Sequence, residues 1–194
     1  MTQTEPSPDP RPASFRARAR FLFTAIRDCQ DTIRAVDTKV SILLAALAIP
    51  LREVATSVAA WHSHGYLVTL GNVLLTAAIL TYVLAAVVAV RTLVGIGDAT
   101  VHVRGARLEN SFYSGGLFRF SPWDALFNHP KAKSTKTVAE FTRDLPQSEG
   151  AMVEELSMEA MAVAYIRDIK LHRQRVAFGA TVVAGALGLL GLIL

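Results

Sequence analysis

Three long apolar segments dominate the hydropathy pattern of this 194-residue sequence. Residues 176–194 carry no charge and show no polar stripe. As a helix they would extend about 28 Å, close to the roughly 30 Å hydrocarbon core of a bilayer. Residues 67–90 are similarly apolar, with Asn72 and a few threonines as their main polar groups. Both segments are predicted to be transmembrane helices.

The other apolar segment, residues 40–61, is interrupted by Pro50 and by the adjacent charges of Arg52 and Glu53. Proline breaks or kinks a helix, and charges in mid-membrane are costly. Two interpretations remain open. Either the segment spans the membrane with Arg52 and Glu53 paired inside a bundle, or the apolar helix is short and ends near Leu51.

Residues 15–39 are predicted to form a cytosolic amphipathic helix with Ser14 as its N-cap. Its apolar side chains recur at alternating spacings of four and three, as in a heptad seam: Phe15, Ala19, Leu22, Ile26, Cys29, Ile33, Val36 and Val40. Such a seam needs a partner helix, from this chain or from another subunit. A helix lying on the membrane surface is the alternative. Residues 1–14 contain four prolines and are predicted to be a disordered tail.

Residues 91–175 are the one polar segment long enough to form a domain. The pattern predicts a turn and a short strand near residues 100–103, a short helix over residues 137–143, and a helix from Ala151 that continues without a break into the last span. The fold class is therefore mainly α, a three-span transmembrane helical protein with a small, mostly helical cytosolic domain.

Charge distribution indicates the topology of the chain. The sequence is 52% hydrophobic and 19% charged, with a formal charge of +4. Of its 20 lysines and arginines, 7 lie in residues 1–39 and 12 in residues 91–175. The positive-inside rule therefore places the N-terminus and residues 91–175 in the cytoplasm and the C-terminus outside. No run of basic residues interleaved with aromatics indicates nucleic-acid binding, and we expect no signal peptide.

Catalytic and metal-binding motifs are missing from the sequence. It contains no GxSxG or HExxH motif and no phosphate-binding loop of the GxxxxGK[ST] type. His62 and His64 are a weak metal signal because no acidic residue or cysteine lies nearby, and the single Cys29 can form no intrachain disulfide. We therefore expect neither an enzyme nor a protein with a cofactor or metal.

An aromatic and glycine-rich segment, residues 111–127, has two interpretations. Its side chains either pack in a core or against the membrane surface, or they form a pocket wall on which a planar base stacks. In the second interpretation backbone amides and a guanidinium would contact a phosphate. The candidate ligand-binding residues are Asn110, Tyr113, Ser114, Gly115, Gly116 and Arg119.

Two further sets of residues stand out near the predicted membrane boundary and in the last span. Asp37 and Lys39 lie where the first helix would enter the membrane. Lys39 can snorkel there, whereas Asp37 is better explained by a buried pair with a lysine or arginine of the cytosolic domain. In the last span, small residues at intervals of four predict close helix association: Ala180, Ala184 and Gly188, with a neighbouring row of Ala177, Thr181 and Gly185.

Taken together, these features resemble the transmembrane effectors of Pycsar, bacterial antiphage systems that pair a pyrimidine cyclase with a membrane effector. The matching stretches are residues 26–47 with their D-x-K motif, residues 109–118 with the aromatic–glycine motif, and residues 162–180 before and into the last span.

The resemblance implies a multi-pass protein of the bacterial inner membrane whose cytosolic domain, residues 91–175, senses a nucleotide. A partner cyclase would make cyclic CMP or cyclic UMP. Binding would shift the effector toward a homo-oligomer that disrupts the membrane and kills the cell, which is abortive infection. The alternatives are a membrane effector of a cyclic-oligonucleotide defence system and a non-signalling scaffold that recruits a partner through its heptad helix.

Overall fold

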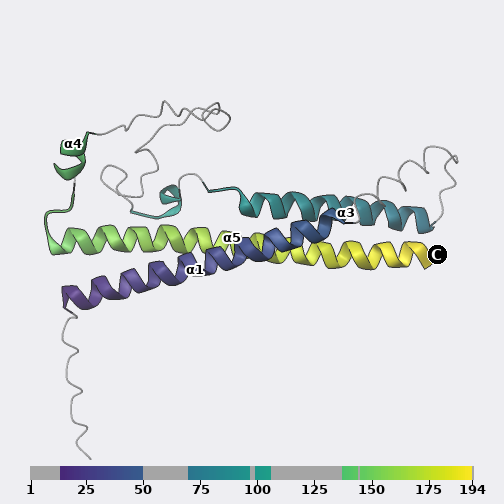
Figure 1. Ribbon diagram of the computed structural model, residues 1–194, viewed down its shortest axis with the longest axis horizontal. Helices are drawn as coiled ribbons and strands as arrows, with labels where there is room; N and C mark the ends of the chain where they lie inside the picture. Colours follow the sequence, from purple (N-terminus) through teal and green to yellow (C-terminus); the bar gives the residue numbers. More distant parts are fainter. Residues whose placement is uncertain (1–13, 50–69, 97–98, 106–136, 144, 194) are drawn as a thin grey trace, which may run out of the picture. The chain divides into compact units, whose positions relative to one another are not determined.

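Helices make up the regular structure in the described part of the chain, which comprises residues 14–49, 70–96, 99–105, 137–143 and 145–193 of a computed structural model. The elements are α1 (Phe15–Ala48), α3 (Leu70–Leu93), the 3-10 helix η1 (Thr100–His102), α4 (Val138–Arg143) and α5 (Glu149–Ile193), drawn in Figure 1. The prediction of a mainly α protein is confirmed for these residues. Most of the predicted tail, residues 1–13, lies outside them.

The start of α1 and its apolar seam agree with the prediction. Ser14 caps the helix, because its Oγ accepts a hydrogen bond of 3.4 Å from the Ala17 amide and its carbonyl accepts one of 3.1 Å from Arg18. All predicted seam residues are buried or half-buried, and the buried row extends to Leu43 and Leu47. The seam therefore faces the protein's own interior along its length.

The end of α1 bears on the first predicted span. The helix ends at Ala48, and the Ile49 amide closes a tight turn on the Ala46 carbonyl at 3.3 Å, directly before Pro50. Proline disfavours helical geometry in the residue before it, which accounts for this end point. Residues 50–61 lie outside the described chain, so a complete first span stays a prediction.

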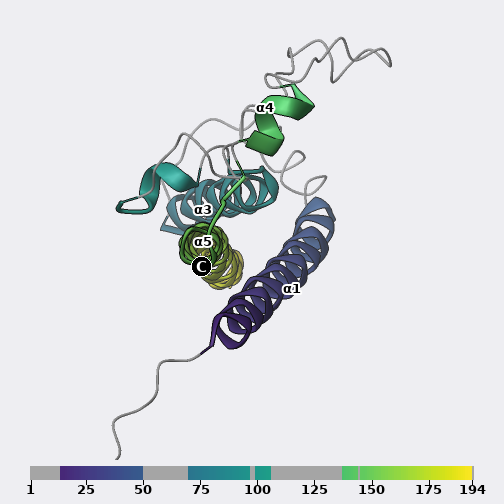
Figure 2. The ribbon, with the colours of Figure 1, turned by 90° about the vertical axis from the view of Figure 1, so that its left-hand side faces the viewer.

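Helices α3 and α5 lie side by side and antiparallel (Figures 1 and 2). Both bury side chains at intervals of seven, and most of these side chains are small. The buried residues of α3 include Gly71, Ala78, Ala85 and Thr92, and the buried row of α5 is Val163, Lys170, Ala177, Ala184 and Gly191. A Cβ on Gly191 would lie only 2.9 Å from Leu75 Cγ and 3.0 Å from the Gly71 carbonyl oxygen, so the glycine is what allows this close approach.

Helix α1 completes the core formed by α3 and α5. One cluster of buried residues joins the three helices: Val36, Val40, Leu43 and Leu47 from α1, Ala85 and Ala89 from α3, and Ala177 from α5. Large side chains of α1 thus fill the space beside the small side chains of the other two helices, as close packing requires.

The short elements are fixed by local hydrogen bonds. Thr137 and Glu140 form a capping box at the start of α4, with the Thr137 amide 2.8 Å from the Glu140 carboxylate and the Glu140 amide 3.2 Å from Thr137 Oγ1. The expected strand near residues 100–103 is wrong. These residues form η1, closed by a 2.9 Å bond from the Val103 amide to the Thr100 carbonyl, and no other described segment offers a strand to pair with.

Helix α5 is unbroken over 45 residues, about 67 Å at about 1.5 Å per residue. It begins two residues before the predicted Ala151, with Ser148 Oγ accepting a 3.2 Å hydrogen bond from the Ala151 amide. The prediction that one helix continues from the polar segment into the last apolar segment is confirmed.

The chain divides into two compact units. One contains residues 1–27 and 100–162, and the other contains residues 28–99 and 163–194. Helices α1 and α5 each contribute to both units. The predicted boundaries of a cytosolic sensing domain at residues 91 and 175 stay a prediction.

Candidate functional site

The predicted ligand-binding residues, which run from Asn110 to Arg119, all lie outside the described chain. The described residues contain two other concentrations of polar chemistry. One is a set of contacts among α1, α3 and α5, and the other is a groove beside the first turns of α5.

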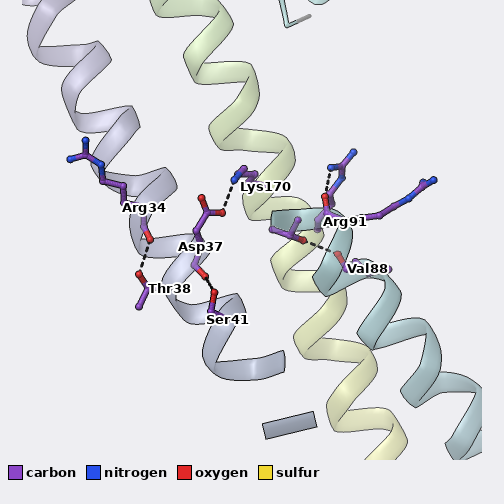
Figure 3. A network of polar contacts seen from close by, with 9 residues as sticks. Arg34, Asp37, Thr38, Ser41, Val88, Arg91 and Lys170 are labelled. Carbon is purple, nitrogen blue, oxygen red and sulfur yellow. Dashed lines mark hydrogen bonds and ion pairs between the residues drawn. The ribbon is translucent and has the colours of Figure 1, made fainter. Parts of the chain in front are cut away.

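Lys170 is the centre of the first set. Its ammonium donates a 2.6 Å hydrogen bond to Oδ1 of Asp37, with the lysine side chain 7% and the aspartate side chain 37% exposed (Figure 3). This is the Asp–Lys pair expected for Asp37. Lys39, two residues further on, is exposed. That Asp37 and Lys39 mark a membrane entrance stays a prediction.

Two arginines extend this set of contacts along α5, one turn to each side of Lys170. Arg167 donates a 3.4 Å hydrogen bond to Cys29 Sγ on α1, and Arg173 donates a 2.8 Å bond to the Arg91 carbonyl in the last turn of α3. The second bond satisfies a carbonyl that has no partner within its own helix. A hydrogen bond to Asp168 raises the pKa of Arg167, so this side chain stays cationic. We call Arg167, Lys170 and Arg173 with their partners the polar junction.

The polar junction ties α5 to both neighbouring helices immediately before the apolar half of α5. Hydroxyls around it bond within their own helices. Ser41 Oγ donates to the Asp37 carbonyl at 2.9 Å, and Thr92 Oγ1 donates to the Val88 carbonyl at 2.9 Å (Figure 3). These hydroxyl bonds lie within single helices, whereas the contacts of Arg167, Lys170 and Arg173 join α5 to its neighbours.

The second concentration of polar chemistry is a groove of about 560 Å³ within the unit that contains the start of α5. Three segments line it: Val103–Gly105 after η1, Arg143 with residues 145–147 at and after the end of α4, and one face of α5 between Ala151 and Met161. We call it the α5 groove. Its volume is in the range of small-molecule sites.

Charges of both signs line the α5 groove. Arg104 and Arg143 lie on the loop side, and Glu154 and Glu155 lie on α5. Gly105 has a φ of +82°, a backbone conformation that side chains rarely adopt, so the chain turns sharply directly after Arg104. Near the groove, burial and then the charge of Glu155 raise the pKa of Glu159.

Within the described part of the chain, two helices, α3 and α5, are long and apolar enough to cross a membrane, by length and composition. Their outer faces carry many exposed large apolar side chains, among them Leu80, Val87, Val182, Leu189 and Leu192. An exposed apolar surface of this extent indicates contact with lipid or with another protein.

The row of small residues predicted for helix association faces the chain's own α3. Ala184 is buried, and a Cβ on Gly188 would lie 3.9 Å from Ala78 Cβ. In the neighbouring predicted row, a Cβ on Gly185 would meet open space. Association between copies of the chain stays a prediction.

The comparison with protein families is decisive for the identity of the chain. The model of the Pycsar effector protein domain matches residues 21–194, which include α1 from its second turn and all the later helices. The chain belongs to the Pycsar effector family. No curated protein and no solved structure gives a significant match.

Membership of the Pycsar effector family confirms the resemblance found in the sequence. The chain is an effector of antiphage defence that acts downstream of a cyclase and is not itself the cyclase. Together with the two apolar helices, this indicates a membrane protein.

Sequence reasoning missed several residues that the structure brings forward. It expected a basic partner for Asp37 but did not identify Lys170, whose signal was its position in a seven-residue repeat of otherwise apolar, mostly small residues. It also missed Arg104 and Arg143, which lie 39 residues apart in sequence and carry no local motif.

Proposed function

We propose that this Pycsar effector binds a cyclic pyrimidine nucleotide, cyclic CMP or cyclic UMP, made by a partner cyclase, and then disrupts the bacterial inner membrane. Cell death before the phage matures would complete an abortive infection. The observation that carries the proposal is the family match over residues 21–194.

The membrane part of the proposal is supported by α3 and the second half of α5. Their outward apolar side chains would be solvated by lipid, and their inward small residues allow the helices to pack closely without a hydrophobic driving force between them. We propose a multi-pass protein with its N-terminus and the α5 groove on the cytoplasmic side, as the distribution of basic residues indicates.

Helix α5 supports the proposed link between ligand and membrane. The α5 groove uses residues 151–161, the polar junction uses residues 167–173, and the apolar segment follows from residue 176. A ligand can shift a conformational equilibrium only by binding one state better than the other. A ligand that holds the first turns of α5 in one position would bias this whole helix, because no proline interrupts it.

Two observations favour this function over the alternatives. The family match favours a pyrimidine cyclase over an oligonucleotide-making enzyme as the partner. The central part of the heptad seam of α1 is buried within the chain, with Ile26, Cys29, Val36 and Val40 all less than a tenth exposed, so these positions are not free to recruit another protein.

Calorimetry and a growth assay test the proposal. The purified full-length protein in detergent should bind cyclic CMP or cyclic UMP and should bind cyclic AMP much more weakly. Induction of a pyrimidine cyclase in cells that contain the effector should depolarise the membrane and stop growth, whereas a catalytically dead cyclase should not. Absence of binding to both cyclic pyrimidine nucleotides would rule out the ligand part of the proposal.

A further inference from the structure

The α5 groove combines the groups that an anionic nucleotide needs, although its residues come from three separate segments. We propose that the α5 groove is the cyclic pyrimidine nucleotide site, with the phosphate held by Arg104 and Arg143. This inference rests on the proposed function and deepens it by assigning the ligand to described residues.

The two arginines supply the anion-binding part of the groove. Arg104 lies directly before Gly105, Arg143 is the last residue of α4, and both residues line the groove. Guanidinium groups match the planar pairs of oxygens on a phosphate and form charge-assisted hydrogen bonds with them. A cyclic phosphodiester carries one negative charge and presents two such exocyclic oxygens.

Apolar side chains supply a surface for the base. Met158 and Met161 project from α5 into the groove lining, and Leu145 lies on the opposite segment. Met161 is 55% and Leu145 is 44% exposed, so both present apolar surface that a planar ring could cover. Thioether groups make favourable contacts with aromatic rings, which suits methionine for this role.

The carboxylates determine which way the ligand lies. Glu154 and Glu155 on the α5 wall would repel a phosphate, so the phosphate belongs on the side of Arg104 and Arg143. The hydrogen-bond donors of the ligand then face α5. These donors are the ribose 2′-hydroxyl and either the 4-amino group of cytosine or the N3–H of uracil. A carboxylate accepts from each of them, and the Gln147 amide can accept or donate beside them.

Calorimetry on the full-length protein and two groove variants tests the assignment. Arg104→Ala and Arg143→Ala should each weaken binding of the preferred cyclic pyrimidine nucleotide at least tenfold. Arg16→Ala removes the same charge from an exposed position on α1 that does not line the groove, and should change the affinity less than twofold. Cytidine, uridine and inorganic phosphate should all bind far more weakly than the cyclic nucleotide. The two nucleosides lack the phosphate, and inorganic phosphate lacks the base and the ribose.

The possible results distinguish an error in the groove assignment from an error in the proposed function. If the wild type binds and both groove variants keep their affinity within twofold, the groove assignment is wrong while the proposed function stands. Equal affinity for inorganic phosphate would also overturn the assignment. If the wild type binds neither cyclic pyrimidine nucleotide, the proposed ligand fails and this inference fails with it. Arg104→Lys and Arg143→Lys keep the charge but lose the paired donors, and they replace any alanine variant that circular dichroism shows to be unfolded.

Discussion

Lys170 and Asp37 form an ion pair of 2.6 Å between helices α5 and α1, although 133 residues separate them in sequence. The two partners differ in burial. The lysine side chain is 7% exposed, whereas the aspartate side chain is 37% exposed and stays partly accessible to solvent. Removing one partner of a buried pair is costly mainly because the other charge is left without compensation.

This asymmetry predicts unequal effects of single substitutions. Asp37→Asn leaves the buried ammonium without a counter-charge and should lower the free energy of unfolding by about 3 kcal/mol. Lys170→Met leaves a partly exposed carboxylate and should cost less. The double variant Asp37→Asn, Lys170→Met should be more stable than Asp37→Asn alone. Thermal unfolding in detergent, followed by circular dichroism, measures all three, and equal losses in both single variants would contradict the expectation.

Gly191 should tolerate no side chain. A methyl group there would meet the Gly71 carbonyl oxygen at 3.0 Å and the Leu75 amide nitrogen at 3.1 Å, which are backbone atoms that cannot move aside independently of α3. Overpacking of this kind costs about 1–3 kcal/mol, so Gly191→Ala should lower the melting temperature. Gly185→Ala is the matched control on the same helix, because its Cβ meets open space. A melting temperature of Gly191→Ala equal to that of the control would contradict the packing described.

Gly185, on an exposed face of α5, provides a test of association between copies of the chain. Ala184 and Gly188 already face α3, so leucine at these positions would disturb the single chain as well as any oligomer. The side chain added by Gly185→Leu would start in open space, so this variant should keep the melting temperature of the wild type. It should reduce oligomer size and toxicity if this face is the interface between copies. Size-exclusion chromatography with light scattering and a growth assay provide the readouts. Unchanged oligomer size and toxicity would show that this face is not an interface.

Glu159 should make the protein less stable as the pH rises. Burial and the charge of Glu155 raise its pKa above the ordinary value of 4.5, so between these two pKa values the folded state holds more protons than the unfolded state. Stability then falls as the pH increases through that window, and the loss stays constant above it. Glu159→Gln should be more stable than wild type at neutral pH and equal to it below about pH 4.

Urea titrations at several pH values measure this difference. Glu154→Gln is the control, because Glu154 is exposed on the same helix. A Glu159→Gln variant that is no more stable than wild type at neutral pH would contradict the inference that burial and Glu155 raise the pKa of Glu159.

Local rules accounted for most of the helical structure. The Ser14 cap, the seam from Phe15 to Val40 and the continuity of α5 all depend on residues close in sequence, and each is observed. The strand expected near Thr100 failed because a strand depends on a partner segment, which local sequence does not specify.

The tertiary contacts were harder to predict. The pattern showed that Asp37 needed a basic partner, but several lysines and arginines could have filled that role and only the packing of α5 on α1 selects Lys170. The sequence predicts rows of small residues at intervals of four, whereas the buried rows of α3 and α5 follow an interval of seven. The α5 groove combines residues from three segments, so no contiguous motif could indicate it.

The seven-residue repeats of α3 and α5 have a consequence for register. Sliding one helix past the other by seven residues, about 10 Å, would bring most of the small residues opposite small residues again, so apart from the close approach at Gly191 these contacts define the alignment of the two helices poorly. Lys170 breaks that equivalence, because it is the one charged residue in the buried row of α5 and only one alignment places it beside Asp37. The ion pair thus fixes the position of α5 along its own axis, as single polar residues fix the register of coiled coils.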